Sequence, residues 1–226
     1  MEQLSKNTVE SANQLKNKGS VYFENTDGKG IRVMFVGNSI TLHGYKPEIG
    51  WFGKWGMAAS AKELDYAHLC MKEILTIDKE ASFCICQVSE WERTYTTGET
   101  QFHLYDDARD FDADIIIMRA VENCPADNVD NTVFRNQLHK LLCYLNPNNK
   151  AKFIITTGFW KHPTDDAIRE YAAEYNLPLS ELGDLGELDE MKAIGLFEHS
   201  GVANHPGDAG MKAIADRIMK KVREII

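Results

Sequence analysis

The stretch IRVMFVGNSIT, residues 31–41, decides the fold predicted for this chain. Its apolar first half, which ends at Val36, is typical of a buried β-strand, and Ser39 follows where such a strand would turn into a loop or helix. The stretch HPGDAG, residues 205–210, places His205 directly before a helical pattern at the other end of the chain. A serine and a histidine so placed would form a nucleophile–base pair if the fold brings the two stretches together.

The chain between these stretches alternates apolar runs with amphipathic helical patterns. Nearly continuous apolar runs, such as the isoleucine-rich 113–118, are typical of strands buried on both faces. The alternation predicts an α/β fold, a three-layer α/β/α sandwich with a five-stranded parallel, flavodoxin-like sheet. The predicted strands are 31–36, 83–88, 113–118, 153–157 and 177–182, and the predicted helices are 60–76, 131–145, 164–175 and 207–225.

Residues 1–30 are predicted to form an N-terminal arm and hairpin ahead of a main domain at 31–226. A loosely amphipathic pattern predicts a short helix over 4–17. An alternating stretch at 20–24, followed by the turn signal DGKG at 27–30, predicts a small hairpin that leads into the first core strand.

Composition excludes several classes of function. The net charge of −9 argues against binding nucleic acid through phosphate contacts, and no apolar run approaches the roughly 20 residues that a membrane helix needs. Residues 1–19 lack the apolar region of a signal peptide, and the five cysteines lie in apolar segments, so we expect a cytoplasmic protein with buried, reduced thiols. No CxxC pair supports a zinc site, and we expect neither metal nor cofactor. The oligomeric state stays open.

Three polar residues converge on one edge of the predicted sheet. Ser39 follows the first strand, Asn123 follows the third, and His205 precedes the last helix. The carboxyl ends of parallel strands share one edge, where ligand sites of open α/β sheets lie. Each residue also has a purely structural interpretation, because serine caps helices, asparagine forms turns, and a histidine can pack at the start of a helix. Their coincidence at one edge favours a functional site.

The two terminal stretches resemble conserved blocks of the SGNH (GDSL-type) hydrolases. Residues 37–41, GNSIT, resemble the first block, residues 205–210 are similar to the last, and residues 121–123, VEN, resemble the third. The resemblance runs from about residue 31 to the end, and it implies an SGNH-hydrolase-like catalytic domain at 31–226. It implies that Ser39 attacks an ester carbonyl, that His205 serves as base, and that the Ser39 N–H and the Asn123 amide form an oxyanion hole.

The chain departs from the family at two points. The family's second block supplies a glycine N–H to the oxyanion hole, whereas residues 89–95 contain no glycine. The aspartate expected three residues before the histidine is Val202. The acid that orients His205 is therefore Glu198 or Asp208, or else a backbone carbonyl holds the ring and leaves a Ser–His dyad.

Aromatic and charged side chains flank the proposed site and are candidates for substrate contact. The aromatic ones would suit stacking on a sugar ring, although packing over the sheet edge explains them equally well. The predicted substrate-binding residues are Asn38, His43, Trp51, Trp55, Trp91, Glu92, Arg119, Glu122 and Trp160.

The sequence is compatible with three functions. The first is a serine esterase acting on a small or carbohydrate-linked acyl ester, with acetyl as a candidate acyl group. The second is a binding module for a carbohydrate or small ligand on the same fold, which the two departures favour. The third is a flavodoxin-like nucleotide or phosphate binder, which would leave His205 and Pro206 unexplained.

Overall fold

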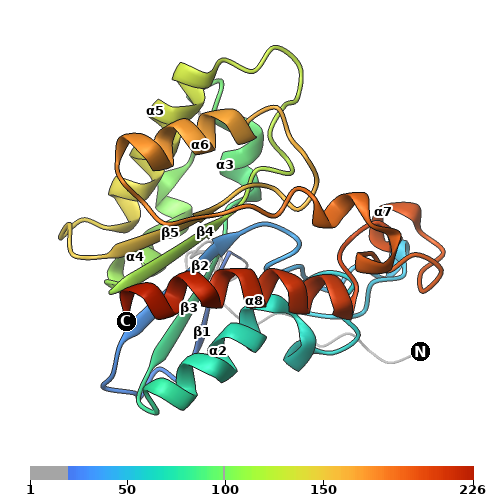
Figure 1. Cartoon of the computed structure of the whole chain (residues 1–226), viewed down its shortest axis with the longest axis horizontal. Coiled ribbons are helices and arrows are strands. Elements are labelled where there is room, and N and C mark those ends of the chain that lie inside the picture. Colours follow the sequence, from blue (N-terminus) through green and yellow to red (C-terminus); the bar gives the residue numbers. More distant parts are fainter. Residues whose placement is uncertain (1–19, 99) are drawn as a thin grey trace, which may run out of the picture.

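The computed structural model describes residues 20–98 and 100–226, which contain a six-stranded sheet in the order β1-β3-β2-β4-β5-β6 (Figure 1). Five of these strands are parallel, in the flavodoxin-like order, and β1 adds an antiparallel edge against β3. The predicted fold class is confirmed, with one more strand than expected. The strands are β1 (Val21–Glu24), β2 (Arg32–Gly37), β3 (Ser82–Gln87), β4 (Ile115–Arg119), β5 (Lys152–Thr156) and β6 (Leu179–Ser180).

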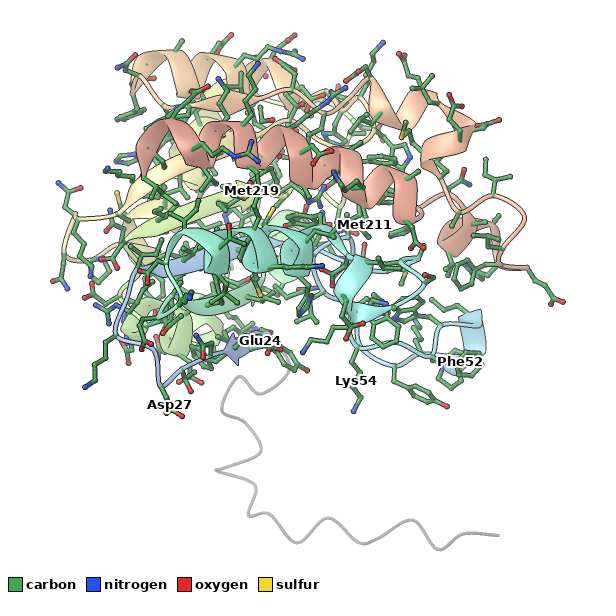
Figure 2. All side chains as sticks on the ribbon, turned by 60° about the horizontal axis from the view of Figure 1, so that its bottom comes forward. Glu24, Asp27, Phe52, Lys54, Met211 and Met219 are labelled. Carbon is green, nitrogen blue, oxygen red and sulfur yellow. The ribbon has the colours of Figure 1, made fainter. Side chains whose placement is uncertain are left out.

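Helices cover both faces of the sheet, as Figure 1 shows. One face carries α2 (Tyr66–Ile77) and α8 (Asp208–Ile225), and Figure 2 shows Met211 and Met219 of α8 directed between these two helices. The other face carries α3 (Ser89–Thr94), α4 (Asp106–Asp110), α5 (Asn131–Leu145) and α6 (Asp165–Glu174), while the short α7 (Ser200–Ala203) lies beyond the sheet edge. In the described part of the chain, no helix has the length and apolarity to cross a membrane.

Strand alternation divides the core into two clusters. Val33 and Phe35 of β2 pack toward α2 and α8, whereas Met34 and Val36 pack toward α5 and α6. All five residues of β4 are buried, because this central strand has a layer on each side. That is the physical reason for its nearly unbroken isoleucine run.

Local sequence signals placed some boundaries incorrectly. The helix predicted to begin at Ser60 begins at Tyr66, because the Asp65 side chain caps it by accepting from the His68 N–H at 2.8 Å. Ser60 instead donates to Asp208 across the chain. The segment after the second core strand, for which no helix was predicted, contains α3.

The predicted N-terminal hairpin is wrong. β1 pairs with β3, with Val21 opposite Cys86, and not with the β2 strand that follows it along the chain. The helix predicted over 4–17 lies outside the described residues, and the division at residue 30 stays a prediction. Of the five cysteines, Cys70, Cys84, Cys86 and Cys124 are buried as expected, but Cys143 is exposed on α5.

Candidate active site

The turn after β2 presents Ser39 at the carboxyl edge of the sheet. The carbonyl of Asn38 accepts from the backbone N–H groups of Thr41 and Leu42, both at 2.9 Å, which closes the turn. Gly37 is required here, since a Cβ at this position would lie 1.9 Å from Thr41 Oγ1 and 2.6 Å from the Arg119 carbonyl oxygen. The close approach of β2, the turn and β4 therefore determines where Ser39 lies.

The fold brings Ser39 and His205 together. Ser39 Oγ lies 2.8 Å from His205 Nε2, although the two residues are 166 positions apart in sequence. The Trp160 ring and the imidazole pack nearly perpendicular to each other, with 5.4 Å between ring centroids. This geometry allows the imidazole to take a proton from the serine hydroxyl.

A backbone carbonyl holds the other nitrogen of His205. His205 Nδ1 lies 2.7 Å from the carbonyl oxygen of Gly201, which fixes the ring with Nε2 toward Ser39. Asp208 is engaged with Ser60 at 2.6 and 2.8 Å, and Glu198 is an exposed side chain in a neighbouring hollow. Of the three alternatives for orienting His205, the geometry supports the carbonyl.

Val202 occupies the position expected for the orienting aspartate, and it is apolar because that position is packed. It is fully buried in a small cluster with Trp51, Met57 and Ala193. This cluster joins the glycine- and tryptophan-rich loop 42–57 to the segment that carries His205, and the Met57 N–H also donates to the Ser39 carbonyl at 2.8 Å. Apolar packing therefore supports both halves of the Ser–His pair.

Burial shapes the basicity of His205. It lowers the pKa of His205 to about 4, and the hydrogen bond to Gly201 opposes this shift only in part. At neutral pH the imidazole is consequently uncharged and able to accept a proton. Without a carboxylate at Nδ1, the imidazolium formed on proton transfer receives less stabilisation than in a Ser–His–Asp triad.

Directly behind Ser39 lies a group of buried charged side chains and one amide that we call the Arg119 cluster: Asn38, Glu92, Arg119 and Glu122. Arg119 pairs with Glu122 at 2.5 Å and donates to Asn38 Oδ1 at 2.5 Å. Asn38 Nδ2 in turn donates to Glu92 at 2.8 Å and to Glu122 at 2.5 Å. The cluster thus ties the residue before Ser39 to β4 and α3.

The two carboxylates of the Arg119 cluster differ in their pKa. Burial opposes ionisation of Glu122, but the charge and hydrogen bonds of Arg119 outweigh it and lower the pKa of Glu122. Burial, together with the nearby Glu122 charge, raises the pKa of Glu92, against the hydrogen bonds from Asn123 and Asn38. Two carboxylates share one guanidinium, so Glu92 is the less compensated charge.

A pocket of about 240 Å³ opens beside the Ser–His pair. Asn123 and His43 line it, and both were predicted to contact substrate or reaction intermediates. Gln87, Ser89 and Arg93 also line it and were missed, although the sheet-edge argument points to them, because Gln87 ends β3 and the other two follow it. The full lining is Ser39, His43, Ile49, Met57, Gln87, Ser89, Arg93, Asn123, His199, Gly201, Val202 and His205.

Most of the predicted substrate contacts lie elsewhere. Asn38, Glu92 and Arg119 are fully buried and, with the nearly buried Glu122, hold the site from behind. Trp91 is buried in the core against Tyr95 and Phe134, so it cannot stack on a ligand. Within the loop 42–57, Trp51 packs against Trp55 with 5.5 Å between ring centroids, and Trp160 packs against His205.

Fold and site together define a doubly wound α/β protein with a serine–histidine pair at the carboxyl edge of its parallel strands. Among the described residues, no group of three or more His, Cys, Asp or Glu side chains could hold a metal ion. Comparison with protein-family profiles gives no match, and neither does comparison with curated protein sequences.

Solved structures that share the fold include esterases and lipolytic proteins. A two-domain esterase active on acetylated mannans matches with a TM-score of 0.58 and 18% identity over 88% of this chain and 50% of its own. A lipase/acylhydrolase from Enterococcus faecalis matches with a TM-score of 0.58 and 16% identity, over 86% of this chain and 96% of its own. A protein assigned to the G-D-S-L lipolytic family from Desulfitobacterium hafniense DCB-2 matches with a TM-score of 0.50 and 12% identity, over 84% of this chain and 99% of its own.

These comparisons confirm the resemblance to SGNH (GDSL-type) hydrolases at the level of the fold. The chain spans about half the length of the mannan esterase that it matches.

Proposed function

We propose that this chain is a serine esterase that hydrolyses a short acyl ester of a carbohydrate or other small alcohol. The observation that carries the proposal is the 2.8 Å contact of Ser39 Oγ with a buried, uncharged His205 whose Nδ1 is held by a carbonyl. A serine oriented only for packing has no need of such a base. The activity of the neighbours in fold supports ester hydrolysis in particular.

In the proposed reaction, Ser39 Oγ attacks the ester carbonyl while His205 Nε2 takes the hydroxyl proton. The tetrahedral oxyanion receives hydrogen bonds from the Ser39 N–H and the Asn123 side-chain amide. Collapse releases the alcohol, which takes the proton from His205, and leaves an acyl group on Ser39. Water gives its proton to His205 and attacks this acyl-enzyme; the carboxylic acid then leaves, and His205 returns the proton to Ser39 Oγ.

In the family, a glycine N–H is the third donor of the oxyanion hole, and this chain has no glycine at the corresponding position. The Ser89 N–H is engaged, because it donates to Gln87 Oε1 at 3.0 Å. We therefore build the proposed oxyanion hole on two donors. Each such donor typically raises turnover by about 10²–10³-fold, so we expect this enzyme to be slower than one with three donors.

The size of the pocket supports a short acyl group. Its volume of about 240 Å³ is below the roughly 300–1,000 Å³ of sites for drug-sized ligands. A second hollow of about 410 Å³ shares Ile49 and His199 with it and is also lined by Glu48, Glu198 and Phe197. Carboxylates beside an aromatic ring suit the hydroxyls and apolar face of a sugar, which supports placing the alcohol there.

We expect 4-nitrophenyl acetate to be hydrolysed with a kcat/KM at least about 10-fold higher than 4-nitrophenyl decanoate, because added methylenes find no room beside Ser39. Release of 4-nitrophenolate measures both reactions. Release of acetate from an acetylated mannan, compared with the same glycan after chemical deacetylation, tests the carbohydrate part. Equal rates on the acetate and the decanoate would contradict a short-acyl site.

We expect kcat/KM to rise with pH through about 4 and then to stay level to neutrality. The pKa of free His205 sits there because burial disfavours the imidazolium, so the proton acceptor is already available at mildly acidic pH. The measurement is the pH profile with 4-nitrophenyl acetate. Glu198→Gln and Asp208→Asn serve as controls and should leave the acidic limb in place. A limb near 6.5, or one displaced by either variant, would contradict this assignment.

A binding module for a carbohydrate or small ligand is the second candidate. The observation that favours it is the lack of a carboxylate on His205 Nδ1, which makes the imidazole a weaker base than in a triad. Labelling with a serine-reactive fluorophosphonate separates the two, since a binding module would not react at Ser39.

A further inference from the structure

Glu92 is a buried carboxyl group that the Ser–His pair does not use. It lies in α3, is fully buried, and its Oε2 accepts from Asn123 Nδ2 at 2.6 Å. Its Oε1 accepts from the Val121 N–H at 2.6 Å and from Asn38 Nδ2 at 2.8 Å. Every polar group in these contacts is a donor, so the site requires a group that only accepts.

We propose that Glu92 is a positioning residue that sets the orientation of the Asn123 amide and thereby supplies the oxyanion hole. This inference rests on the proposed function, because it assigns the Asn123 amide to the oxyanion. An asparagine amide has two N–H donors at one end and an acceptor at the other. A carboxylate, which only accepts, favours the rotamer with Nδ2 toward Glu92 and leaves the second N–H for the pocket that Asn123 lines.

The energetics of the Arg119 cluster support a role in function rather than in stability. A single guanidinium, that of Arg119, faces both Glu92 and Glu122 in this cluster, and Glu122 takes the 2.5 Å contact with it. A buried charge without its own counter-ion is destabilising relative to a neutral group of the same shape. Glutamine has that shape and would relieve the excess charge, so stability alone would favour it over glutamate at position 92.

Glutamine would, however, reverse one hydrogen bond. Its carbonyl oxygen can keep the donors Val121 N and Asn38 Nδ2, which turns its NH₂ toward Asn123. Asn123 then meets a donor instead of an acceptor, and its amide rotates by about 180° to present Oδ1. An oxygen or a displaced N–H would replace the donor of the oxyanion hole.

The test is a double-mutant cycle of Glu92→Gln and Asn123→Ala, measured with 4-nitrophenyl acetate. We expect each single variant to lower kcat by about 10²–10³-fold with a smaller change in KM. The double variant should be no slower than Asn123→Ala alone, because both changes remove the same donor. The melting temperature of Glu92→Gln should equal or exceed that of the wild type, and Glu170→Gln, an exposed glutamate on α6, should match the wild type throughout.

Several results would overturn the inference. The first is a kcat of Glu92→Gln within about 3-fold of the wild type. The second is a double variant in which the two losses of kcat multiply, and the third is a loss of kcat that is matched by a fall in melting temperature. A readout without turnover is the pair of side-chain amide NMR resonances of Asn123, identified by their disappearance in Asn123→Ala. These should shift in Glu92→Gln but not in Glu170→Gln, and unshifted resonances would also overturn the inference. A wild type that shows no Ser39-dependent turnover, but whose Asn123 resonances respond as expected, would refute the proposed function alone.

Discussion

Ser39→Ala is expected to abolish turnover of 4-nitrophenyl acetate, lowering kcat by at least about 10³-fold. The hydroxyl that lies 2.8 Å from His205 Nε2 is the atom that would form the acyl-enzyme, and no water can replace it in the same covalent route. Removing one oxygen at a half-buried position should leave the fold intact. Labelling by a fluorophosphonate, followed by mass spectrometry of the modified peptide, should locate the label on Ser39 in the wild type and find none in the variant.

A matched control is Ser82→Ala, which removes another serine hydroxyl at the opposite edge of the sheet. Ser82 Oγ donates to the Gly28 carbonyl at 3.1 Å and does not touch the site. Its activity per folded molecule should stay within about 3-fold of the wild type, as expected for a change away from the reacting atoms. Turnover that survives in Ser39→Ala would refute the assignment of Ser39 as the nucleophile and would favour the binding module.

Asn38→Asp is expected to destabilise the protein by about 3–5 kcal/mol at neutral pH. The resembling family accepts aspartate as well as asparagine before its serine, but here Asn38 Nδ2 donates to Glu92 at 2.8 Å and to Glu122 at 2.5 Å. An aspartate would turn an oxygen toward both carboxylates and leave Arg119 as the cation for three of them. Urea unfolding at pH 7 measures the loss of free energy.

The pH dependence of this loss follows from the same contacts. Crowding by two carboxylates would raise the pKa of the introduced aspartate in the folded state above its value in the unfolded chain. The destabilisation is then fully present at neutral pH and diminishes as the pH falls through the folded-state pKa, where one carboxyl of the cluster takes a proton. Asn136→Asp, an exposed asparagine on α5, is the control and should change stability by less than about 0.5 kcal/mol. Equal stability of Asn38→Asp and Asn136→Asp would contradict the hydrogen-bond assignment.

The local pattern predicted the fold well wherever burial alone determines an element. The run at 31–36 became β2, the isoleucine-rich run at 113–118 became β4, and the pattern at 131–145 became α5 with the predicted bounds. Each of these elements is recognised by the period of its buried face, which is a property of consecutive residues. The helix predicted from Ser60 failed because its true cap, Asp65, is chosen by contacts with Gly56 and His68.

For the site, the sequence by itself determined that Ser39, Asn123 and His205 lie at one edge, because parallel strands put their carboxyl ends together. Only the tertiary structure decided what each polar atom meets. The Gly201 carbonyl at His205 Nδ1 depends on how the chain folds around α7, and the bond from Asn123 to Glu92 joins residues 31 positions apart. Such pairings follow from strand register and side-chain direction across layers, which no pattern along the chain specifies. They make Asn38, Glu92 and Arg119 the support behind the site, although their positions along the chain had suggested contact with the substrate.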